Sequence, residues 1–247
     1  MLINGAEVVV SALKKEGADT VFGYPGGMAL PLYDALYDSG IRHILTRHEQ
    51  GAVHAADGYA RASGKVGVCI STSGPGATNL ITGIATAYMD SVPLVCFTCQ
   101  VTTGVLGKDS FQEADITGIT TPITKHNFMV SEADSLPQII AEAFYIARTG
   151  RPGPVVVDIP KDIFGKEIWY DYPSEINLRG YHPLEAGDES AVSIVADALS
   201  VAQRPLLFIG GGTIIAEVGD AILELVEKTG IPVVSSLMAL SILDKDH

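Results

Sequence analysis

The sequence has 247 residues, of which 47% are hydrophobic and 18% are charged, and its net charge is −13. This acidic balance argues against nucleic-acid binding, which needs a basic surface. No uninterrupted apolar run reaches the about 18 residues that a membrane helix requires, and the N-terminus lacks the basic flank and apolar core of a signal peptide. We therefore expect a soluble, cytoplasmic protein with no nucleic-acid and no membrane partner.

Helices and strands are predicted to alternate over the first two thirds of the chain. Asn4 is a predicted N-cap, with Glu7 as its capping-box partner, and Gly17 ends that helix. The patterns then predict strands over 20–23, 41–46, 66–72, 93–98 and 154–159, and helices over 31–39, 49–62, 77–89 and 136–149. Ser135 is a predicted cap of the last helix, and Pro137 fits its first turn. Strands separated by helices indicate an α/β fold with a doubly wound parallel sheet.

This rhythm stops after residue 165, so that 1–165 is the first predicted domain. Residues 166–187 contain Tyr, Pro, Asp and Gly without periodicity and are predicted to be a linker. Helical faces within 192–199 and 218–226, with strands over 205–209 and 231–235, indicate a second α/β domain in 188–247. About 60 residues with two strands are too few to form a parallel sheet that is covered on both faces. We therefore expect this domain to be incomplete and the chain to be a fragment.

Cys96 and Cys99 form a Cys-x-x-Cys motif that invites a metal or redox interpretation. A structural zinc site needs four ligands, and no second pair of Cys or His stands at a matching spacing. Both cysteines lie in a strand-like apolar run, where Cys behaves as a small hydrophobic residue. We therefore expect no metal ligand in this sequence.

Three loops are predicted at the carboxyl ends of strands, where ligands of open α/β sheets bind. They are Gly23-Tyr24-Pro25-Gly26-Gly27, Arg47-His48-Glu49-Gln50-Gly51-Ala52 and Ser71-Thr72-Ser73-Gly74-Pro75-Gly76-Ala77-Thr78-Asn79. Each loop also has an ordinary interpretation. The first fits a strand-to-helix turn, the second places the Glu49 carboxylate where a helix N-terminus favours negative charge, and the third is a Gly-Pro-Gly turn. The third loop lacks the Lys-Ser/Thr ending of a Walker A motif. Taken singly, none of the three decides a function.

The ordered combination of these motifs carries a family resemblance. Stretches 24–27, 47–52, 73–79 and 151–154 follow one another as in the pyrimidine-binding domain of thiamine-diphosphate enzymes. Within that superfamily, the stretches 109–113, 124–127, 150–154 and 158–162 resemble the N-terminal part of the large catalytic subunit of acetolactate synthase. Stretches 210–212 and 235–238 resemble the flavin-binding domain of the same family.

The resemblance implies decarboxylation of pyruvate and condensation with a second 2-oxo acid, in branched-chain amino-acid biosynthesis. Thiamine diphosphate would carry the electron-sink chemistry, and the protein would supply binding and electrostatics. The resemblance gives Glu49 a catalytic role, because its carboxyl group would hydrogen-bond a ring nitrogen of the aminopyrimidine. Glutamate suits this role since it can share a proton with the ring.

Other site residues follow from the same resemblance. Those expected around the pyrimidine are Tyr24, Pro25, Gly26, Gly27, Pro75 and Asn79. Gln112 would orient a 2-oxo acid, Phe111 would exclude water, and Lys161 would attract the carboxylate. Each has an alternative: a solvated loop residue for Gln112, core packing for Phe111, and a solvated lysine for Lys161.

The resemblance also implies FAD and Mg²⁺. The residues expected at the flavin are Arg151, Gly210, Gly211, Gly212, Ser236, Leu237 and Met238. The family binds the diphosphate and Mg²⁺ through Gly-Asp-Gly and a downstream Asn. Here Gly219-Asp220 is followed by Ala221, and no Asn occurs after Asn177. We therefore expect the metal-binding half of the site to be absent from this chain, and the isolated chain to be inactive.

Three further hypotheses concern function and partners. A pyruvate oxidase or a glyoxylate carboligase would be another flavin-containing thiamine-diphosphate enzyme, but stretch 109–113 favours acetolactate synthase, and glyoxylate carboligase lacks the glutamate seen at Glu49. A non-catalytic interaction module is the third alternative, and the intact Glu49 argues against it. The expected partners are small 2-oxo acids, further copies in a homodimer or higher oligomer, and a regulatory subunit.

Overall fold

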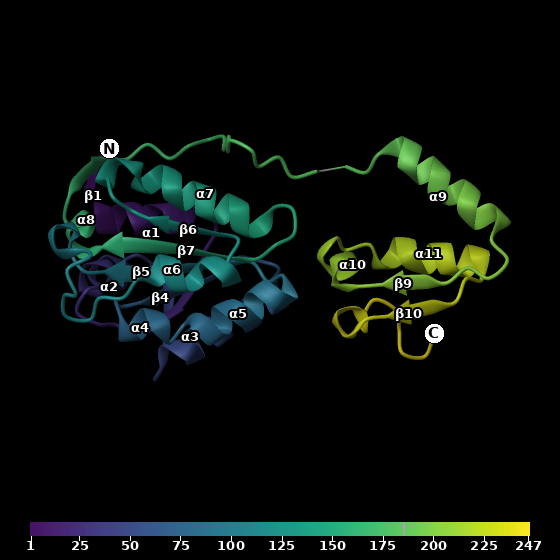
Figure 1. Cartoon of the computed structure of the whole chain (residues 1–247), viewed down its shortest axis with the longest axis horizontal. Coiled ribbons are helices and arrows are strands. Elements are labelled where there is room, and N and C mark those ends of the chain that lie inside the picture. The colour runs from purple at the N-terminus through teal and green to yellow at the C-terminus, as the bar shows by residue number, and fades with distance from the viewer. Residues whose placement is uncertain (185) are drawn as a thin grey trace. The chain divides into compact units, whose positions relative to one another are not determined.

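The computed structural model describes residues 1–184 and 186–247, and the chain forms two compact units, Met1–Pro183 and Leu184–His247. Figure 1 shows both units. Glu185, which falls within the predicted linker, lies outside the described residues. No helix in the described ranges is long and apolar enough to cross a membrane.

The first unit is built on a parallel sheet, as predicted, and this sheet has six strands. Its strands, in spatial order, are β3 (Arg42–Leu45), β2 (Thr20–Gly23), β4 (Gly67–Ser71), β5 (Leu94–Gln100), β7 (Pro154–Pro160) and β6 (His126–Met129). The central strands β4, β5 and β7 are buried along their whole length, which explains their uninterrupted apolar sequences. Strand β6 was not predicted, because it lies at an edge of the sheet and is only half-buried.

Helices cover both faces of this sheet, which confirms the doubly wound architecture (Figure 1). One face packs against α1 (Gly5–Lys15), α2 (Leu30–Tyr37), α7 (Leu136–Arg148) and α8 (Lys161–Phe164). The other packs against α3 (Glu49–Ser63), α4 (Pro75–Thr78), α5 (Ile81–Asp90) and α6 (Ile116–Thr120). Cys96 and Cys99, three residues apart on β5, point into opposite cores, and both are fully buried and unoxidised. Their burial fits small hydrophobic residues.

Local signals explain some helix ends and fail at others. The capping box of α1 is confirmed: Asn4 Oδ1 accepts from Glu7 N, and Glu7 Oε2 accepts from Asn4 N, each at 3.0 Å. Ser135 is the N-cap residue of α7, as predicted, but its hydroxyl makes no capping hydrogen bond and donates to the Glu132 carbonyl at 2.7 Å instead. Pro137 does lie in the first turn of α7. The single helix predicted over 77–89 is broken into α4 and α5, with Asn79 between them.

Residues 166–183, which fall within the predicted linker, belong to the first unit and pack against its other residues. Strand β8 (Glu167–Trp169) pairs antiparallel with β1 (Leu2–Asn4). Tyr172 Oη donates to Glu16 Oε1 at 2.6 Å. Further along, Tyr181 Oη donates to the Thr149 carbonyl at 2.9 Å. The predicted linker therefore contains a strand and tyrosine contacts that its lack of periodicity did not indicate.

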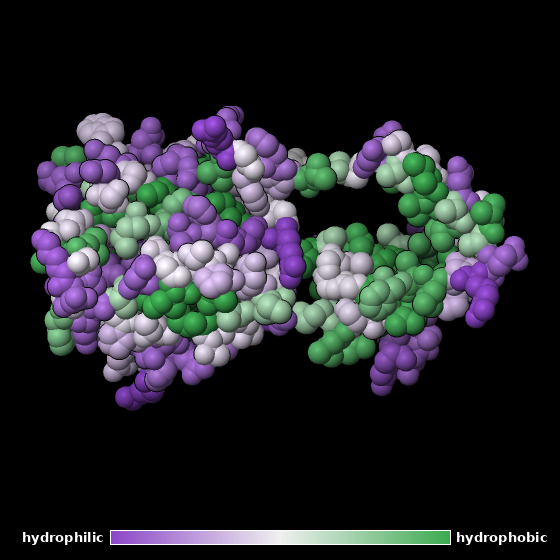
Figure 2. Space-filling view, viewed as in Figure 1, coloured by the Kyte–Doolittle hydropathy of each residue, from purple (hydrophilic) through white to green (hydrophobic). Residues whose placement is uncertain are grey.

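The second unit has a small α/β core. Its elements are α9 (Glu189–Val201), β9 (Leu207–Ile209), α10 (Gly211–Ile215), α11 (Gly219–Thr229) and β10 (Val233–Ser235). Strands β9 and β10 are parallel, and their small core contains the buried residues Ile209, Ile222, Val226 and Ala239. Figure 2 shows hydrophobic residues over much of the visible face of this unit. Those exposed on α9 are Val192, Ile194, Val195, Leu199 and Val201.

One carboxylate lies deep in the first unit. Asp158 on β7 has no exposed surface, and it accepts hydrogen bonds from Thr98 Oγ1 at 2.7 Å and Gln100 Nε2 at 3.1 Å. Burial raises the pKa of Asp158 from 3.8 to about 6, which outweighs the lowering by the two hydrogen bonds. Folding therefore favours the protonated form of this carboxyl.

This pKa predicts a stability that falls as the pH rises from about 4 to about 6. In this window the unfolded chain has released the Asp158 proton and the folded chain retains it, so unfolding releases a proton. The raised pKa corresponds to a loss of at most about 3 kcal/mol above pH 6. Asp158→Asn should remove this contribution, measured as the difference in urea unfolding free energy between variant and parent from pH 4 to pH 7. The exposed Asp134→Asn is the control, and an equal pH dependence in all three chains would contradict the prediction.

Candidate functional site

The parallel sheet brings the three predicted loops to one edge, at the carboxyl ends of β2, β3 and β4. Glu49 is the first residue of α3, and only 8% of it is exposed. Asn79 Nδ2 donates to Glu49 Oε2 at 3.0 Å. Within the described residues, Glu49 Oε1 accepts no hydrogen bond, so one oxygen of a largely buried carboxylate is free to meet a ligand.

Thr72 joins the first and third loops. Its Oγ1 accepts from Met28 N at 3.3 Å, and its side chain fills the space beside Gly26 and Gly76. A Cβ at Gly26 would lie 2.5 Å from Thr72 Cβ, and one at Gly76 would lie 2.7 Å from Thr72 Cγ2 and 3.2 Å from Glu49 Oε1. Glycine is thus needed at both positions for the loops to approach each other and Glu49. The role of Thr72 could not be predicted from the sequence, because its contacts with Met28 and Gly26 join residues that are distant along the chain.

The remaining residues expected around a pyrimidine share this edge. Tyr24 follows β2, donates its N–H to the Ile70 carbonyl at 3.4 Å, and keeps 40% of its surface exposed. Pro25 is half-buried and Gly27 is exposed. Pro75 is exposed at the start of α4. These residues follow β2 and β4 at the edge that carries Glu49, and they offer apolar groups and backbone there.

The loop after β5 brings Gln112 to the same edge. Gly74 has a φ of 50°, and a Cβ there would lie 2.4 Å from the Gln112 carbonyl oxygen. Gln112 itself has a φ of 58°, in the left-handed region that a non-glycine residue rarely adopts. Phe111 is 81% exposed, so core packing does not explain it. The loop therefore presents an aromatic ring and an amide side chain beside the Gly-Pro-Gly turn.

Glu113 closes this loop on itself. Its carboxylate accepts hydrogen bonds from Ser110 N and Ser110 Oγ, each at 2.8 Å, and from Gly107 N. The backbone hydrogen bond from Ser110 is the largest cause that lowers the pKa of Glu113, followed by that from Gly107. The charge thus holds residues 107–113 in a compact turn.

Lys161 also follows a strand at this edge, as the first residue of α8. It is half-buried rather than fully solvated. The next residue, Asp162, accepts from Thr103 N at 2.9 Å and Thr103 Oγ1 at 2.7 Å. The start of α8 and the loop that carries Phe111 are therefore bonded to each other.

Arg151 lies elsewhere in the first unit. It precedes β7, so it stands at the amino edge of the sheet, opposite the edge that carries Glu49. Its Nε donates to Ser91 Oγ at 2.7 Å, and a terminal nitrogen donates to the Met89 carbonyl at 3.3 Å. In this structure Arg151 therefore caps the C-terminal end of α5.

The other expected flavin residues meet in the second unit, at the carboxyl ends of β9 and β10. Ser236 N donates to the Ile209 carbonyl at 2.9 Å, which brings the residues after one strand beside those after the other. A Cβ at Gly211 would lie 3.0 Å from Met238 Cβ. Gly210, Gly211 and Gly212 therefore form one surface with Ser236, Leu237 and Met238, with Leu237 80% exposed.

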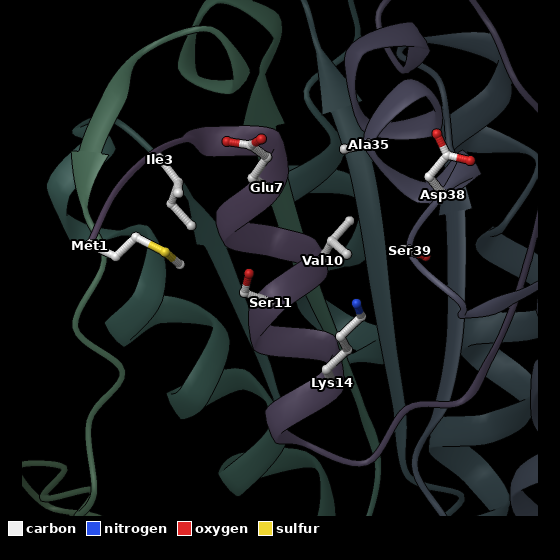
Figure 3. A pocket seen from close by; sticks show the side chains of 9 residues that line it. All are labelled: Met1, Ile3, Glu7, Val10, Ser11, Lys14, Ala35, Asp38 and Ser39. Carbon is white, nitrogen blue, oxygen red and sulfur yellow. The ribbon is translucent and has the colours of Figure 1, made fainter.

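A cavity of about 280 Å³ lies apart from these residues, between α1, β1 and the C-terminal end of α2 (Figure 3). Glu7, Lys14 and Asp38 are the charged groups on its wall. The Glu7 carboxylate is already occupied by the capping box of α1. None of the predicted site residues lines this cavity.

Comparison with known proteins decides the family. Two family models match: the thiamine pyrophosphate enzyme N-terminal TPP binding domain over residues 3–119, and the thiamine pyrophosphate enzyme central domain over 192–247. The chain belongs to the thiamine pyrophosphate enzyme family. Thiamine diphosphate is the cofactor that gives this family its name.

Individual thiamine pyrophosphate enzymes are similar over nearly the whole chain. The acetolactate synthase large subunit of Corynebacterium glutamicum is 52% identical over 246 residues, which are 99% of this chain and 39% of the relative. The probable acetolactate synthase large subunit of Methanocaldococcus jannaschii is 50% identical over 248 residues, 99% of this chain and 42% of the relative. The acetolactate synthase isozyme 3 large subunit of Escherichia coli is 49% identical over 249 residues, 100% of this chain and 43% of the relative. The chain spans about two fifths of the length of these relatives, and the predicted resemblance is confirmed.

The contact between Thr72 and Gly26 predicts opposite outcomes at two neighbouring glycines of this family member. Gly26→Ala should lower the free energy of unfolding by about 1–3 kcal/mol, because its methyl group would overlap the Thr72 side chain. Gly27→Ala is the matched control, since a Cβ there meets nothing within 4 Å, and it should change stability by less than about 0.5 kcal/mol. Urea unfolding followed by circular dichroism measures both. Equal losses in the two variants would show that Thr72 does not join the loops.

Proposed function

We propose that this chain is part of an acetolactate synthase large subunit. The enzyme would decarboxylate pyruvate and condense the product with a second 2-oxo acid, in branched-chain amino-acid biosynthesis. The observation that carries the proposal is Glu49, a largely buried carboxylate held through Oε2 by Asn79, with Oε1 free beside the loop that carries Gly76. The similarity of about one residue in two to named acetolactate synthases supports this reaction over others of the family.

Thiamine diphosphate fits the residues around Glu49. The free Oε1 is the partner that a pyrimidine ring nitrogen needs, and glycine at position 76 keeps the approach to it open. Tyr24, Pro25, Gly26, Gly27, Pro75 and Asn79 would hold the ring. When bound, the cofactor supplies a carbanion and an electron sink for decarboxylation. Glu49 would share a proton with the ring nitrogen from its free oxygen, while Asn79 keeps the other oxygen in place.

Substrate residues would come from the loop after β5 and from the start of α8. Gln112 would donate hydrogen bonds to a 2-oxo acid, and the exposed ring of Phe111 would exclude water from it. Lys161 would attract the substrate carboxylate. Their common position at the carboxyl edge of the sheet supports these roles.

FAD and Mg²⁺ are the further cofactors we propose. The glycine-rich surface formed by 210–212 with 236–238 would let a flavin lie against backbone, and Arg151 would add a phosphate contact if it left its present partners on α5. The chain has no Gly-Asp-Gly motif, so Mg²⁺ and the diphosphate would be held by residues outside it. We propose that the pyrimidine-binding domain extends over 1–165 and the flavin-binding domain over 188–247.

The assembly we propose follows from the absence of the Gly-Asp-Gly motif in this chain. A site with its metal ligands elsewhere needs a second segment or chain, so we expect a homodimer or higher oligomer. The relatives from Corynebacterium glutamicum and Escherichia coli are named large subunits, which supports a smaller, regulatory partner. The substrates would be small 2-oxo acids.

The test combines the chain with a separately produced C-terminal portion of a related acetolactate synthase. We expect thiamine diphosphate and Mg²⁺ to bind tightly, and pyruvate to yield acetolactate, only in the mixture. Glu49→Gln should lower kcat by about 100-fold or more, because an amide cannot share the ring proton. Calorimetry measures binding, and product analysis measures turnover.

Glu132→Gln is the control, since Glu132 is exposed and follows β6, which lies at the opposite end of the strand order from β3, the strand before Glu49. Equal activity of Glu49→Gln and the parent mixture would refute the role of Glu49. Release of CO₂ without a condensation product would refute acetolactate synthesis and point to another thiamine-diphosphate reaction.

A further inference from the structure

Gln100 is a buried amide whose hydrogen-bonding capacity is almost completely used. It is the last residue of β5 and is 1% exposed. Its Nε2 donates to Asp158 Oδ2 at 3.1 Å and to the Ala114 carbonyl at 2.9 Å, while its Oε1 accepts from Val101 N at 2.9 Å. A carbonyl and a carboxylate on one side and a backbone N–H on the other allow only this orientation of the amide.

These bonds connect the two ends of the loop that carries Phe111 and Gln112. Val101 begins the loop directly after β5, and Ala114 ends it before α6. Gln100 therefore bonds both ends at once, and Asp158 anchors the amide to the neighbouring strand β7. Between the two ends, the loop has its own attachments, through Thr103 to Asp162 and through the Glu113 turn.

The hydrogen bond from Gln100 to Asp158 is strong because the carboxylate is charged and shielded from water. Asp158 has no exposed surface, and Thr98 Oγ1 satisfies its other oxygen at 2.7 Å. Hydrogen bonds to a carboxylate are stronger than those between neutral groups, and a buried donor that loses its partner is costly. No apolar residue at position 100 could replace the two bonds donated by Nε2 and the one accepted by Oε1.

We propose that Gln100 is a positioning residue, which clamps both ends of the 101–114 loop to the buried carboxylate of Asp158 and so fixes where Phe111 and Gln112 stand at the site. The clamp itself rests on the contacts above. Its consequence for a 2-oxo acid rests on the proposed function. A loosened loop would present Gln112 in many orientations, so substrate binding would weaken while the pyrimidine side, held by Thr72 and Asn79, would stay as it is.

Two variants separate the clamp from general stability. Gln100→Leu removes the bonds to Asp158, Val101 and Ala114. Thr98→Val is the matched control, because it removes a hydrogen bond to the same carboxylate without touching the loop. Hydrogen–deuterium exchange on the purified chain measures the amides of 102–114, and urea unfolding measures global stability in parallel.

We expect both variants to be less stable than the parent chain. Only Gln100→Leu should speed exchange across 102–114, by about tenfold or more, through local opening. Equal acceleration in both variants, or none in Gln100→Leu, would overturn the clamp. If Gln100→Leu does not fold, Gln100→Asn serves in its place: it keeps an amide but is one methylene too short to reach Asp158 and Ala114 together, and the same outcomes decide.

The consequence for substrate is measured in the mixture with the C-terminal portion. Gln100→Leu should raise the KM for pyruvate by about tenfold and leave the affinity for thiamine diphosphate unchanged, whereas Thr98→Val should alter neither. An unchanged KM together with a loosened loop would overturn the positioning role. Absence of turnover in the parent mixture would instead count against the proposed function, and the exchange result would still decide the clamp.

Discussion

Parallel pairing of the strands is the constraint on which the rest of the molecule depends. In such a sheet all carboxyl ends lie at one edge, so the loops after β2, β3, β4, β5 and β7 must meet there, although they come from residues 24 to 161. Glu49, Asn79, Gln112 and Lys161 share that edge for this reason alone. The same rule places Arg151, which precedes β7, at the opposite edge, where it caps α5.

The loops at this edge are held together by close backbone approach as much as by polar bonds. Thr72 occupies the space that side chains at positions 26 and 76 would need, and Gly74 lies directly against the Gln112 backbone. Three glycines therefore act as spacers that set the distance between loops to within a methyl group. The arrangement suits the role proposed for Glu49, because Asn79 and packing position its carboxylate before any ligand arrives.

Buried polar groups give the site its rigidity, and one of them makes the stability of the fold depend on pH. Asp158 would be more favourable as a neutral residue above pH 6, since burial raises its pKa to about 6. In its ionised form it anchors Gln100, which holds the loop that carries Phe111 and Gln112. The expected loss of pH dependence in Asp158→Asn and the expected loosening of the loop in Gln100→Leu are therefore two consequences of one network.

Much of this architecture could be predicted from the sequence. Apolar runs of strand length separated by helical periodicity indicated the parallel α/β sheet, the spacing of Asn4 and Glu7 indicated the α1 cap, and the order of the loop motifs indicated the family and Glu49. These features are local, or repeat along the chain. Strand β6, the pairing of β8 with β1, the exposure of Phe111, and the contacts of Thr72 and Gln100 were decided by the tertiary structure. Each depends on strand register and on which distant residue lies alongside, and neither periodicity nor spacing encodes that choice.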